Sequence, residues 1–297
     1  MPAERRSPPT ARVVAVLDHF VAARGERAGL SALARALGMS KPTCLGILVE
    51  LTAAGYLVRD ARTLTYGLGP ALIAAGRVAQ ESFAAADVAR RHLTPLMERY
   101  RATCAASTVL GEEIMVLETV VPPGAPPVKV GERYPFAPPS GLMYVLWAPD
   151  AEFDRWLAKE PTLPMRMDRE HLRTVVSRCR ATGYLVETLT PFGTRLHALM
   201  AGVAAYDLPD EVRALMGEMV SSLGERVYLG ADLAPADLHP VHLIAAPTYD
   251  AEGAQDLVLT LHVGTSITGT EITHRGAALV TAAATITAEL GGRLPAR

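Results

Sequence analysis

Residues 38–69, GMSKPTCLGILVELTAAGYLVRDARTLTYGLG, decide how the first part of this chain folds. Their first half predicts a helix that begins at Ser40, because a serine hydroxyl accepts a hydrogen bond from a free N–H group of the first turn. Pro42 fits that turn, where the N–H group that proline lacks is not needed. Gly55 is expected to end the helix.

The second half of this stretch predicts a β-hairpin. Apolar and polar residues alternate over residues 56–58 and 64–68, and a polar tip separates the two runs. Arg59 and Arg62 stand at that tip, where they could contact phosphates or a minor groove. A helix start beside an arginine-tipped hairpin therefore indicates a unit that binds nucleic acid.

Two further helices are predicted before this stretch. Residues 12–24 predict an amphipathic helix, because apolar residues recur there at spacings of three and four. The apolar stripe consists of Val13, Val16, Leu17, Phe20 and Val21. The second helix is predicted to begin with Ser31 as its cap and to end at Gly38. A short helix, a tight turn and another helix form a helix-turn-helix unit, to which the hairpin adds a wing.

Candidate DNA contacts follow from the chemistry of a recognition helix, whose first turn must reach base edges and phosphates in a major groove. Small hydroxyls, a lysine and free backbone N–H groups suit that task. The candidate DNA-binding residues are Ser40, Lys41, Pro42, Thr43 and Cys44 at the helix start, with Arg59 and Arg62 in the wing. The alternative is a three-helix scaffold that binds no nucleic acid.

Charge is distributed unevenly along the 297 residues, a length that predicts about two domains. Residues 1–80 hold ten Lys and Arg against five Asp and Glu, whereas the remainder holds 19 against 26. A basic first part indicates a polyanionic partner. Three widely spaced cysteines favour reduced thiols in the cytoplasm, and no apolar run is long enough to span a membrane.

The stretch resembles the winged helix-turn-helix of IclR-type transcriptional regulators. The resemblance rests on LARALGMSKPT, LVELTAAGYLVRD and YGLG, which match that family in the helices, the Gly-Tyr entry to the wing and its Tyr-x-Leu-Gly exit. The family often carries His-Arg shortly after the Lys-Pro-Thr, where this chain has Leu45 and Gly46. This difference removes a phosphate-binding arginine, and a glycine weakens a helix by about 1 kcal/mol relative to alanine.

The rest of the chain predicts an α+β domain with an antiparallel sheet covered by helices. Hairpins are predicted from residues 105–110 with 114–121 and from residues 241–246 with 256–263, and a final helix from residues 270–290. This order, and the end AAPTYDAEGAQDLVLTLHVG, resemble the GAF-like effector domain of the same regulators. The resemblance implies three parts: a winged helix-turn-helix domain (residues 1–69), a linker helix (70–86) and a GAF-like effector-binding and oligomerisation domain (87–297).

Between the two hairpins the sequence predicts a loop followed by helices. Residues 122–139 contain seven prolines and predict the loop. Helices are predicted over residues 141–148, 150–159, 168–182 and 209–223, and a strand over residues 183–190. Asp150 is expected to cap the second of these helices.

Candidate effector-binding residues come from strand alternation and from the resemblance. Side chains alternate between the two faces of a strand. Along residues 257–263 the leucines are therefore expected on the packed face, and Thr260 and His262 on the other face. The resemblance implies that Thr260 and His262 occupy positions that contact the ligand, and that Glu187 matches the acidic residue after a Gly-Tyr. The candidate set is Ser140, Gly141, Glu187, Val241, Leu243, Thr260 and His262. An apolar cleft with such groups suits a small organic acid or a polar aromatic, whereas the alternative is that Thr260 and His262 face solvent.

These features predict a cytoplasmic, ligand-responsive transcriptional regulator that binds a pseudo-palindromic DNA operator as a dimer or tetramer. We expect no cofactor and no catalytic residue, because nucleophile-elbow, P-loop and HExxH patterns are absent from the sequence. His239 and His242 are a weak candidate for a metal-binding pair. Two alternatives remain: a small-molecule sensor or protein-interaction module whose helix-turn-helix no longer binds DNA specifically, and an enzyme built on the second domain.

Overall fold

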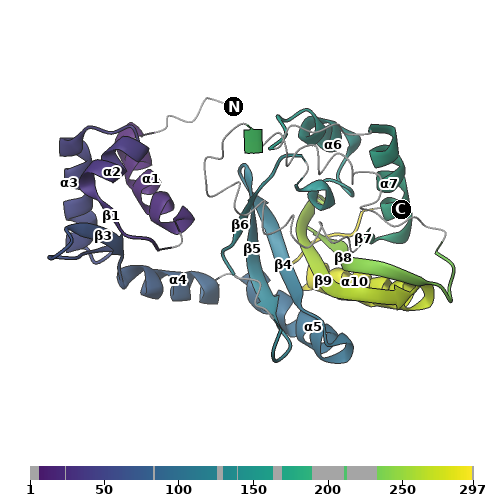
Figure 1. The fold of residues 1–297 in the computed structure, drawn as a ribbon. Helices are drawn as coiled ribbons and strands as arrows, with labels where there is room; N and C mark the ends of the chain where they lie inside the picture. Colours follow the sequence, from purple (N-terminus) through teal and green to yellow (C-terminus); the bar gives the residue numbers. More distant parts are fainter. Residues whose placement is uncertain are drawn as a thin grey trace. The chain divides into compact units, whose positions relative to one another are not determined.

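Two units with separate cores, Met1–Phe83 and Ala84–Arg297, make up the computed structural model of this chain (Figure 1). The structure describes residues 7–23, 25–82, 84–125, 130–138, 140–162, 169–188, 211–212 and 233–295. No helix within these ranges is long and apolar enough to cross a membrane.

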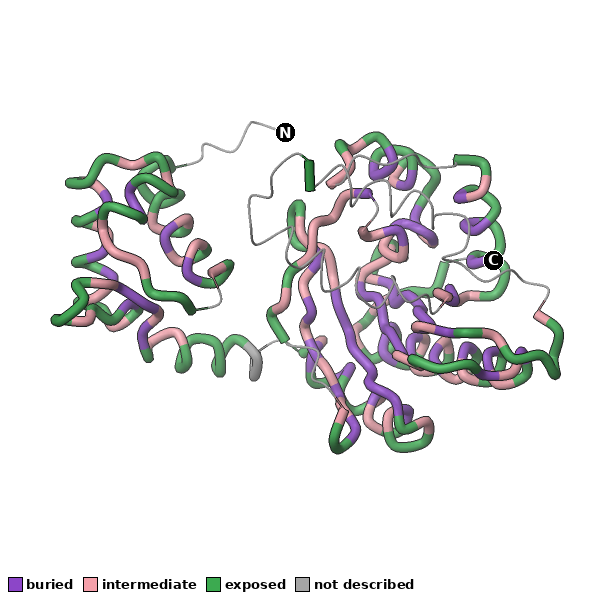
Figure 2. Tube along the Cα trace, viewed as in Figure 1, coloured by how far each residue is buried: buried purple, intermediate pink, exposed green. Residues whose placement is uncertain are grey.

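Three helices of the first unit pack against a small antiparallel sheet, and a fourth helix follows. The elements are α1 (Pro8–Ala22), β1 (Ala28–Gly29), α2 (Leu30–Ala36), α3 (Lys41–Ala53), β2 (Leu57–Arg59), β3 (Thr65–Leu68) and α4 (Ala71–Ser82). The sheet has the order β1-β3-β2, so the predicted hairpin gains a third strand that alternation did not indicate. The buried core consists of Val16, Phe20, Leu33, Ala34, Cys44, Leu48, Leu51, Leu57 and Tyr66 (Figure 2).

The start and the end of α3 are as predicted. The Ser40 hydroxyl accepts a hydrogen bond from the Thr43 N–H group at 3.3 Å, and Pro42 lies in the first turn. Gly55 follows the helix with a φ of +77°, a left-handed conformation that glycine adopts without steric cost. These local signals define the second helix of the helix-turn-helix.

Two predicted details of the preceding helices are wrong. Ser31 does not cap α2, because the cap position is Gly29 and Ser31 already lies inside the helix. Pairing of Gly29 with Thr65 makes the helix begin directly after β1. Val21 of α1 is exposed and does not belong to the buried stripe. Its neighbour Phe20 occupies the buried position, and successive residues of a helix point about 100° apart.

The second unit is built on a six-stranded antiparallel sheet with the order β6-β5-β4-β9-β8-β7. Its strands are β4 (Cys104–Leu110), β5 (Glu113–Val120), β6 (Arg133–Pro135), β7 (Leu185–Thr188), β8 (Leu238–Tyr249) and β9 (Gln255–Thr268). Its helices are α5 (Ala84–Tyr100), the single turn η1 (Leu142–Tyr144), α6 (Asp150–Leu157), α7 (Arg169–Thr182) and α10 (Gly269–Glu289). Both predicted hairpins are therefore confirmed.

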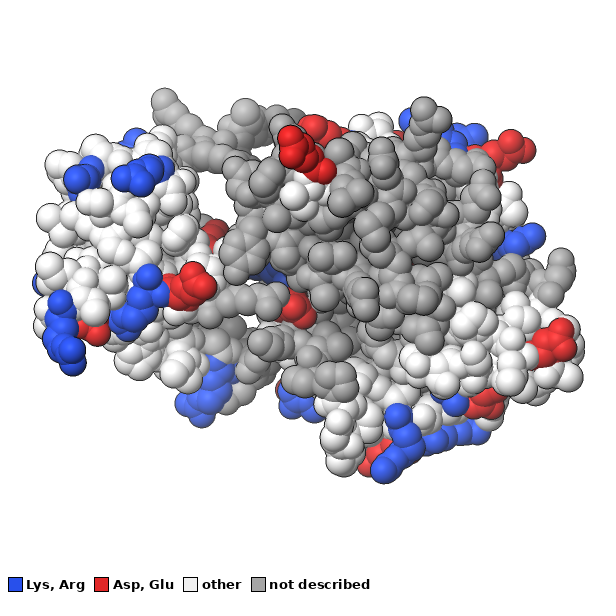
Figure 3. All heavy atoms as spheres, viewed as in Figure 1, with Lys and Arg blue, Asp and Glu red and all other residues white. Residues whose placement is uncertain are grey.

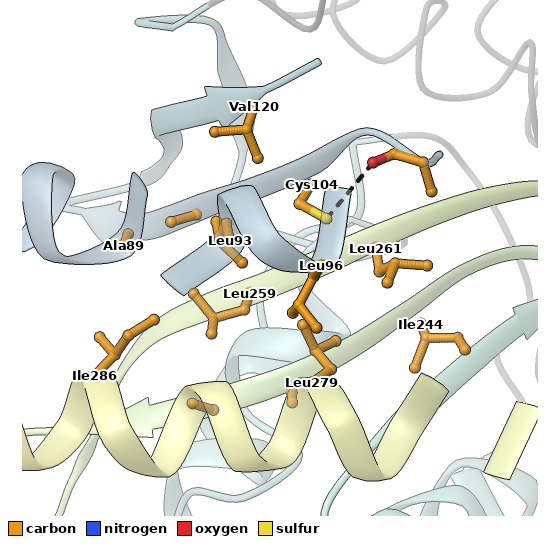
Figure 4. Close-up of a cluster of buried hydrophobic side chains, with 14 of the residues drawn as sticks. Ala89, Leu93, Leu96, Cys104, Val120, Ile244, Leu259, Leu261, Leu279 and Ile286 are labelled. Atoms are coloured by element: carbon orange, nitrogen blue, oxygen red, sulfur yellow. Dashed lines mark hydrogen bonds between the residues drawn. The ribbon is translucent and has the colours of Figure 1, made fainter. Parts of the chain in front are cut away.

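Both faces of this sheet carry packed side chains. On one face, α5 and α10 cover strand residues such as Leu259 and Leu261, and the Leu259 side chain lies toward Ile286 of α10 (Figure 4). On the other face, η1, α6 and α7 cover Leu243 and Val258. The second face of β9 is therefore buried around Val258 and Thr260, beside an apolar cluster.

The proline-rich segment contains more regular structure than predicted. Residues 122–139 are not a loop throughout, because β6 pairs with the edge of β5. The helix predicted over residues 141–148 is limited to η1, which begins after Gly141 at a φ of +99°. A left-handed residue cannot continue a right-handed helix, so the chain turns there before a single 3₁₀ turn forms.

Asp150 does not cap α6. The cap position is Pro149, and the Asp150 carboxylate instead pairs with Arg180 of α7 at 2.7 Å. The helix predicted over residues 209–223 lies almost entirely outside the described residues.

Candidate nucleic-acid interface and effector site

The first turn of α3 presents an exposed polar surface. The hydroxyls of Ser40 and Thr43 lie 2.8 Å apart, and Lys41 and Pro42 between them are exposed. The N–H groups at the start of a helix attract anions, and the lysine adds a positive charge at the same place. This turn has the groups that a phosphate or a base edge requires.

Cys44, one of the candidate DNA contacts, differs from its neighbours in α3. Its side chain is fully buried in the core of the first unit. Burial raises the pKa of its thiol. Cys44 therefore contributes to packing, and its side chain is not at the surface that Lys41 and Pro42 share.

The wing between β2 and β3 is held by an aspartate. The Asp60 carboxylate accepts hydrogen bonds from the N–H groups of Thr63 at 3.0 Å and Arg62 at 2.8 Å. These two bonds lower the pKa of Asp60. The guanidinium carbon of Arg59 lies 5.9 Å from the centre of the Tyr66 ring, and Arg62 is exposed at the tip.

Arg27 braces the wing by hydrogen bonds to both of its strands. The sequence did not indicate this role of Arg27. Its Nη2 donates to the carbonyl groups of Val58 and Thr65, both at 3.2 Å, and its Nε donates to the Thr65 hydroxyl at 3.2 Å. These partners lie 31 and 38 residues further along the chain, so no local pattern could have indicated them.

A shallow groove of about 420 Å³ lies between α3 and the wing. It is lined by Leu45, Val49, Thr52, Ala53, Arg59 and Tyr66. Lys and Arg side chains lie at several places on the face of the first unit that Figure 3 shows. The groove therefore combines an apolar wall from α3 with a cationic rim from the wing.

Three of the candidate effector residues occupy one row across the sheet of the second unit. Glu187 of β7 is opposite Leu243 of β8, which is opposite His262 of β9. Thr260 is buried, and its hydroxyl lies 3.4 Å from the His262 Nε2 atom. The His262 ring meets the ring of His242 edge-on at 5.8 Å. These side chains gather on the face that η1, α6 and α7 cover, so the solvent-facing alternative is wrong for Thr260.

Val241 does not belong to this group, although the sequence placed it beside Leu243. The pairing register shifts between Val241 and Leu243, opposite Thr188 and Glu187. Such a bulge turns two residues that would share a face to opposite faces. Val241 packs with α5 and α10, whereas Leu243 packs with α6 and α7.

Ser140 and Gly141 form the turn before η1. The Ser140 carbonyl accepts a hydrogen bond from Trp156 Nε1 at 3.1 Å, which ties the turn to α6. A side chain at Gly141 would lie 2.7 Å from the Phe136 ring. The turn thus sets the position of η1 over the sheet.

Tyr144 and Ser107 are polar residues of this face that sequence reasoning missed. The Tyr144 hydroxyl of η1 lies 2.5 Å from the Ser107 hydroxyl of β4. Burial raises the pKa of Tyr144, and the negative charge of Glu187 raises it further. Ser107 of β4 and Thr260 of β9 lie on neighbouring strands, so the hydroxyl pair lies close to the other polar residues of this face.

No group of three or more His, Cys, Asp or Glu side chains suited to a metal occurs in the part of the chain that the structure describes. Within that part, the pair His239 and His242 therefore has no further ligand of these types.

Comparison with known proteins supports this arrangement. Residues 9–61 match the IclR helix-turn-helix domain. The chain is similar in fold to an IclR transcriptional regulator from Alicyclobacillus acidocaldarius, with 20% identity and a TM-score of 0.66. The match covers 97% of this chain and 100% of that regulator. It is also similar in fold to an IclR homologue from Microbacterium hydrocarbonoxydans complexed with 4-hydroxybenzoate, with 21% identity and a TM-score of 0.62. That match covers 95% of this chain and 98% of the homologue. No curated protein sequence matches the chain.

The fold and the two sites define a winged helix-turn-helix regulator with a separate effector-binding domain. Residues 9–61 are an IclR helix-turn-helix domain, and the chain as a whole shares the fold of IclR transcriptional regulators. The match to the IclR helix-turn-helix domain favours a transcriptional regulator over the enzyme alternative.

Proposed function

We propose that this protein binds a two-fold symmetric DNA operator and that a small metabolite controls the binding. In this proposal the first turn of α3 enters the major groove, and the arginine-tipped wing contacts the neighbouring backbone. The observation that carries it is that α3 and the wing line one groove and that each of them carries an exposed cation. Lys41 stands exposed at the capped start of α3, and Arg62 stands exposed on a wing that Arg27 braces.

The symmetric operator requires two copies of the recognition helix, which a dimer or a tetramer supplies. Support comes from α4, where Ile73 and Val78 are 76% and 55% exposed. Large apolar side chains on one helix are suited to pairing with a second copy of the chain.

The effector is proposed to bind on the sheet face that carries Ser107, Tyr144, Glu187, Thr260 and His262. Hydroxyl, imidazole and carboxylate groups there lie beside the apolar cluster of Leu243 and its neighbours. Such a mixture suits a small organic acid or a polar aromatic. The Microbacterium relative, whose structure contains 4-hydroxybenzoate, makes hydroxybenzoates the first compounds to test.

Control of DNA binding is proposed to be a population shift. The effector stabilises one arrangement of the two DNA-binding units, and only one arrangement matches the spacing of the half-sites. The protein is proposed to act in the cytoplasm, where DNA and metabolites are both available.

The test is selection of genomic DNA fragments on the purified protein at near-physiological salt, followed by sequencing. Enrichment of a two-fold symmetric site is expected. On that site Arg62→Ala should weaken binding and reduce the slope of log K against log salt by about 1, because one phosphate contact is lost. Arg178→Ala, an exposed arginine of α7, is the matched control and should change neither quantity.

A second candidate function is a small-molecule sensor whose helix-turn-helix no longer binds DNA specifically. The observation in its favour is the exposed surface of α3, where Leu45, Gly46 and Val49 carry no hydrogen-bonding side chain. Absence of any enriched fragment, with a folded protein that still binds an effector, would establish this alternative.

A further inference from the structure

The middle of α3 has an exposed surface that the contacts proposed above do not use. Leu45 is 42% exposed and Val49 is 52% exposed, and neither belongs to the core of the first unit. Gly46 lies beside them, and a side-chain carbon placed on it would meet no atom within 4 Å. This part of the recognition helix is therefore apolar where it faces outward.

The charges around this surface favour DNA over a protein as its partner. Lys41 lies one helical turn before Leu45, and Arg59 lines the same groove as Leu45 and Val49. The first 80 residues carry twice as many basic as acidic side chains. Glu50 is also exposed, one helical turn after Gly46, but it is not among the residues that line the groove.

An apolar surface can distinguish base pairs in only one way. Every base edge in the major groove offers hydrogen-bond donors or acceptors, and thymine alone adds a methyl group. Aliphatic side chains make no hydrogen bonds, but they bury a methyl group favourably. We propose, on the basis of the function proposed above, that Leu45 and Val49 recognise the C5-methyl groups of thymines in each operator half-site.

The spacing of the two side chains fits this assignment. Residues four apart in a helix are about 6 Å apart along its axis. Successive nucleotides of one strand are about 3.4 Å apart along DNA. Leu45 and Val49 therefore reach thymines about two base pairs apart. Gly46 lies at the edge of this surface, and the lack of a side chain there lets the helix backbone come close to DNA.

The experiment uses the full-length protein and the operator that the genomic selection yields. Each thymine of a half-site is replaced in turn by uracil, which removes the methyl group and leaves every hydrogen-bonding group in place. At one or two positions the wild type should bind roughly fourfold more weakly, the effect of losing one buried methyl group. Leu45→Ala or Val49→Ala should bind the thymine and uracil operators equally at the position that the side chain contacts.

Matched controls separate this effect from general weakening. Val14→Ala changes a 50% exposed valine of α1 and should leave the uracil penalty intact. Leu45→Ala should leave the salt dependence of binding unchanged, because an apolar contact releases no counterion, whereas Lys41→Ala should reduce its slope by about 1.

The outcomes distinguish this inference from the proposed function. If the wild type binds its operator but no uracil substitution weakens binding, the methyl contact is rejected and DNA binding stands. If Leu45→Ala changes only the oligomeric state in sedimentation, the surface is a protein interface and the inference is rejected. If the wild type enriches no DNA, both the inference and the proposed function are rejected.

Discussion

The hydroxyl of Tyr144 lies 2.5 Å from the hydroxyl of Ser107, and this contact joins the turn η1 to the central strand β4 of the sheet. The two residues are 37 positions apart in the chain. The contact places two polar atoms on the face that also carries Glu187 and Thr260. A ligand on this face would therefore meet groups from η1 and from three different strands.

Tyr144→Phe is expected to reduce the increase in melting temperature that an effector causes. The substitution keeps the ring and removes one hydrogen bond, which contributes about 1 kcal/mol. Thermal unfolding with and without hydroxybenzoates and small organic acids measures the change. The control is Tyr100→Phe, because Tyr100 packs against the opposite face of the sheet. This variant should show the same effector-induced increase in melting temperature as the wild type. An equal shift in both variants would exclude Tyr144 from the effector site.

Ser40→Ala is expected to destabilise the first unit by about 1 kcal/mol, because Thr43 loses its capping partner. Ser40→Gly should cost only a few tenths of a kcal/mol. Ser31→Ala is the matched control, since Ser31 lies inside α2 and does not cap it. Chemical denaturation of the three variants measures the differences. Equal effects of Ser31→Ala and Ser40→Ala would contradict the assigned cap.

Gly46→Ala is expected to stabilise the first unit by about 1 kcal/mol, because the added methyl group meets open space and alanine favours the helix. Gly69→Ala should have the opposite sign. Its methyl carbon would lie 2.2 Å from the Gly55 carbonyl oxygen, so the backbone would have to move. Midpoints of denaturation compare the two variants. Stabilisation by Gly69→Ala would mean that the close approach to Gly55 does not exist.

The wing is expected to loosen in acid. Hydrogen bonds from Thr63 and Arg62 lower the pKa of Asp60 in the folded state. Its contribution to stability is therefore present above the unfolded value, about 4, and is lost as the pH falls through the folded pKa. Amide hydrogen exchange at Thr63 should accelerate in acid relative to amides of α1. Asp60→Asn, which can still accept both bonds but does not titrate, should remove this dependence.

Several features were predictable because they depend on neighbours in the chain. A capping serine, a proline in the first turn and a glycine after the last turn act within one turn of helix. The predicted start of α3 at Ser40 and its end before Gly55 are accordingly confirmed. The two hairpins of the second unit follow from alternation with a period of two, which is also a local pattern.

The prediction of the effector face was less complete for a physical reason. Alternation predicts that Val241 and Leu243 share a face, and this holds only in a regular ladder. The bulge between them depends on how β7 pairs with β8, and this pairing joins distant parts of the chain. Neither residue carries a signal of it in its own sequence.

The sequence by itself determined the winged helix-turn-helix, its cap and its arginine tip, because short-range hydrogen bonds and hydrophobic periodicity specify them. Only the tertiary structure decided which side chains meet: Arg27 bracing the wing, Cys44 in the core, and Tyr144 with Ser107 over the sheet. Each of these arrangements joins residues that are remote in sequence. Their contacts arise when helices pack on sheets and apolar surface leaves water, which no local pattern encodes.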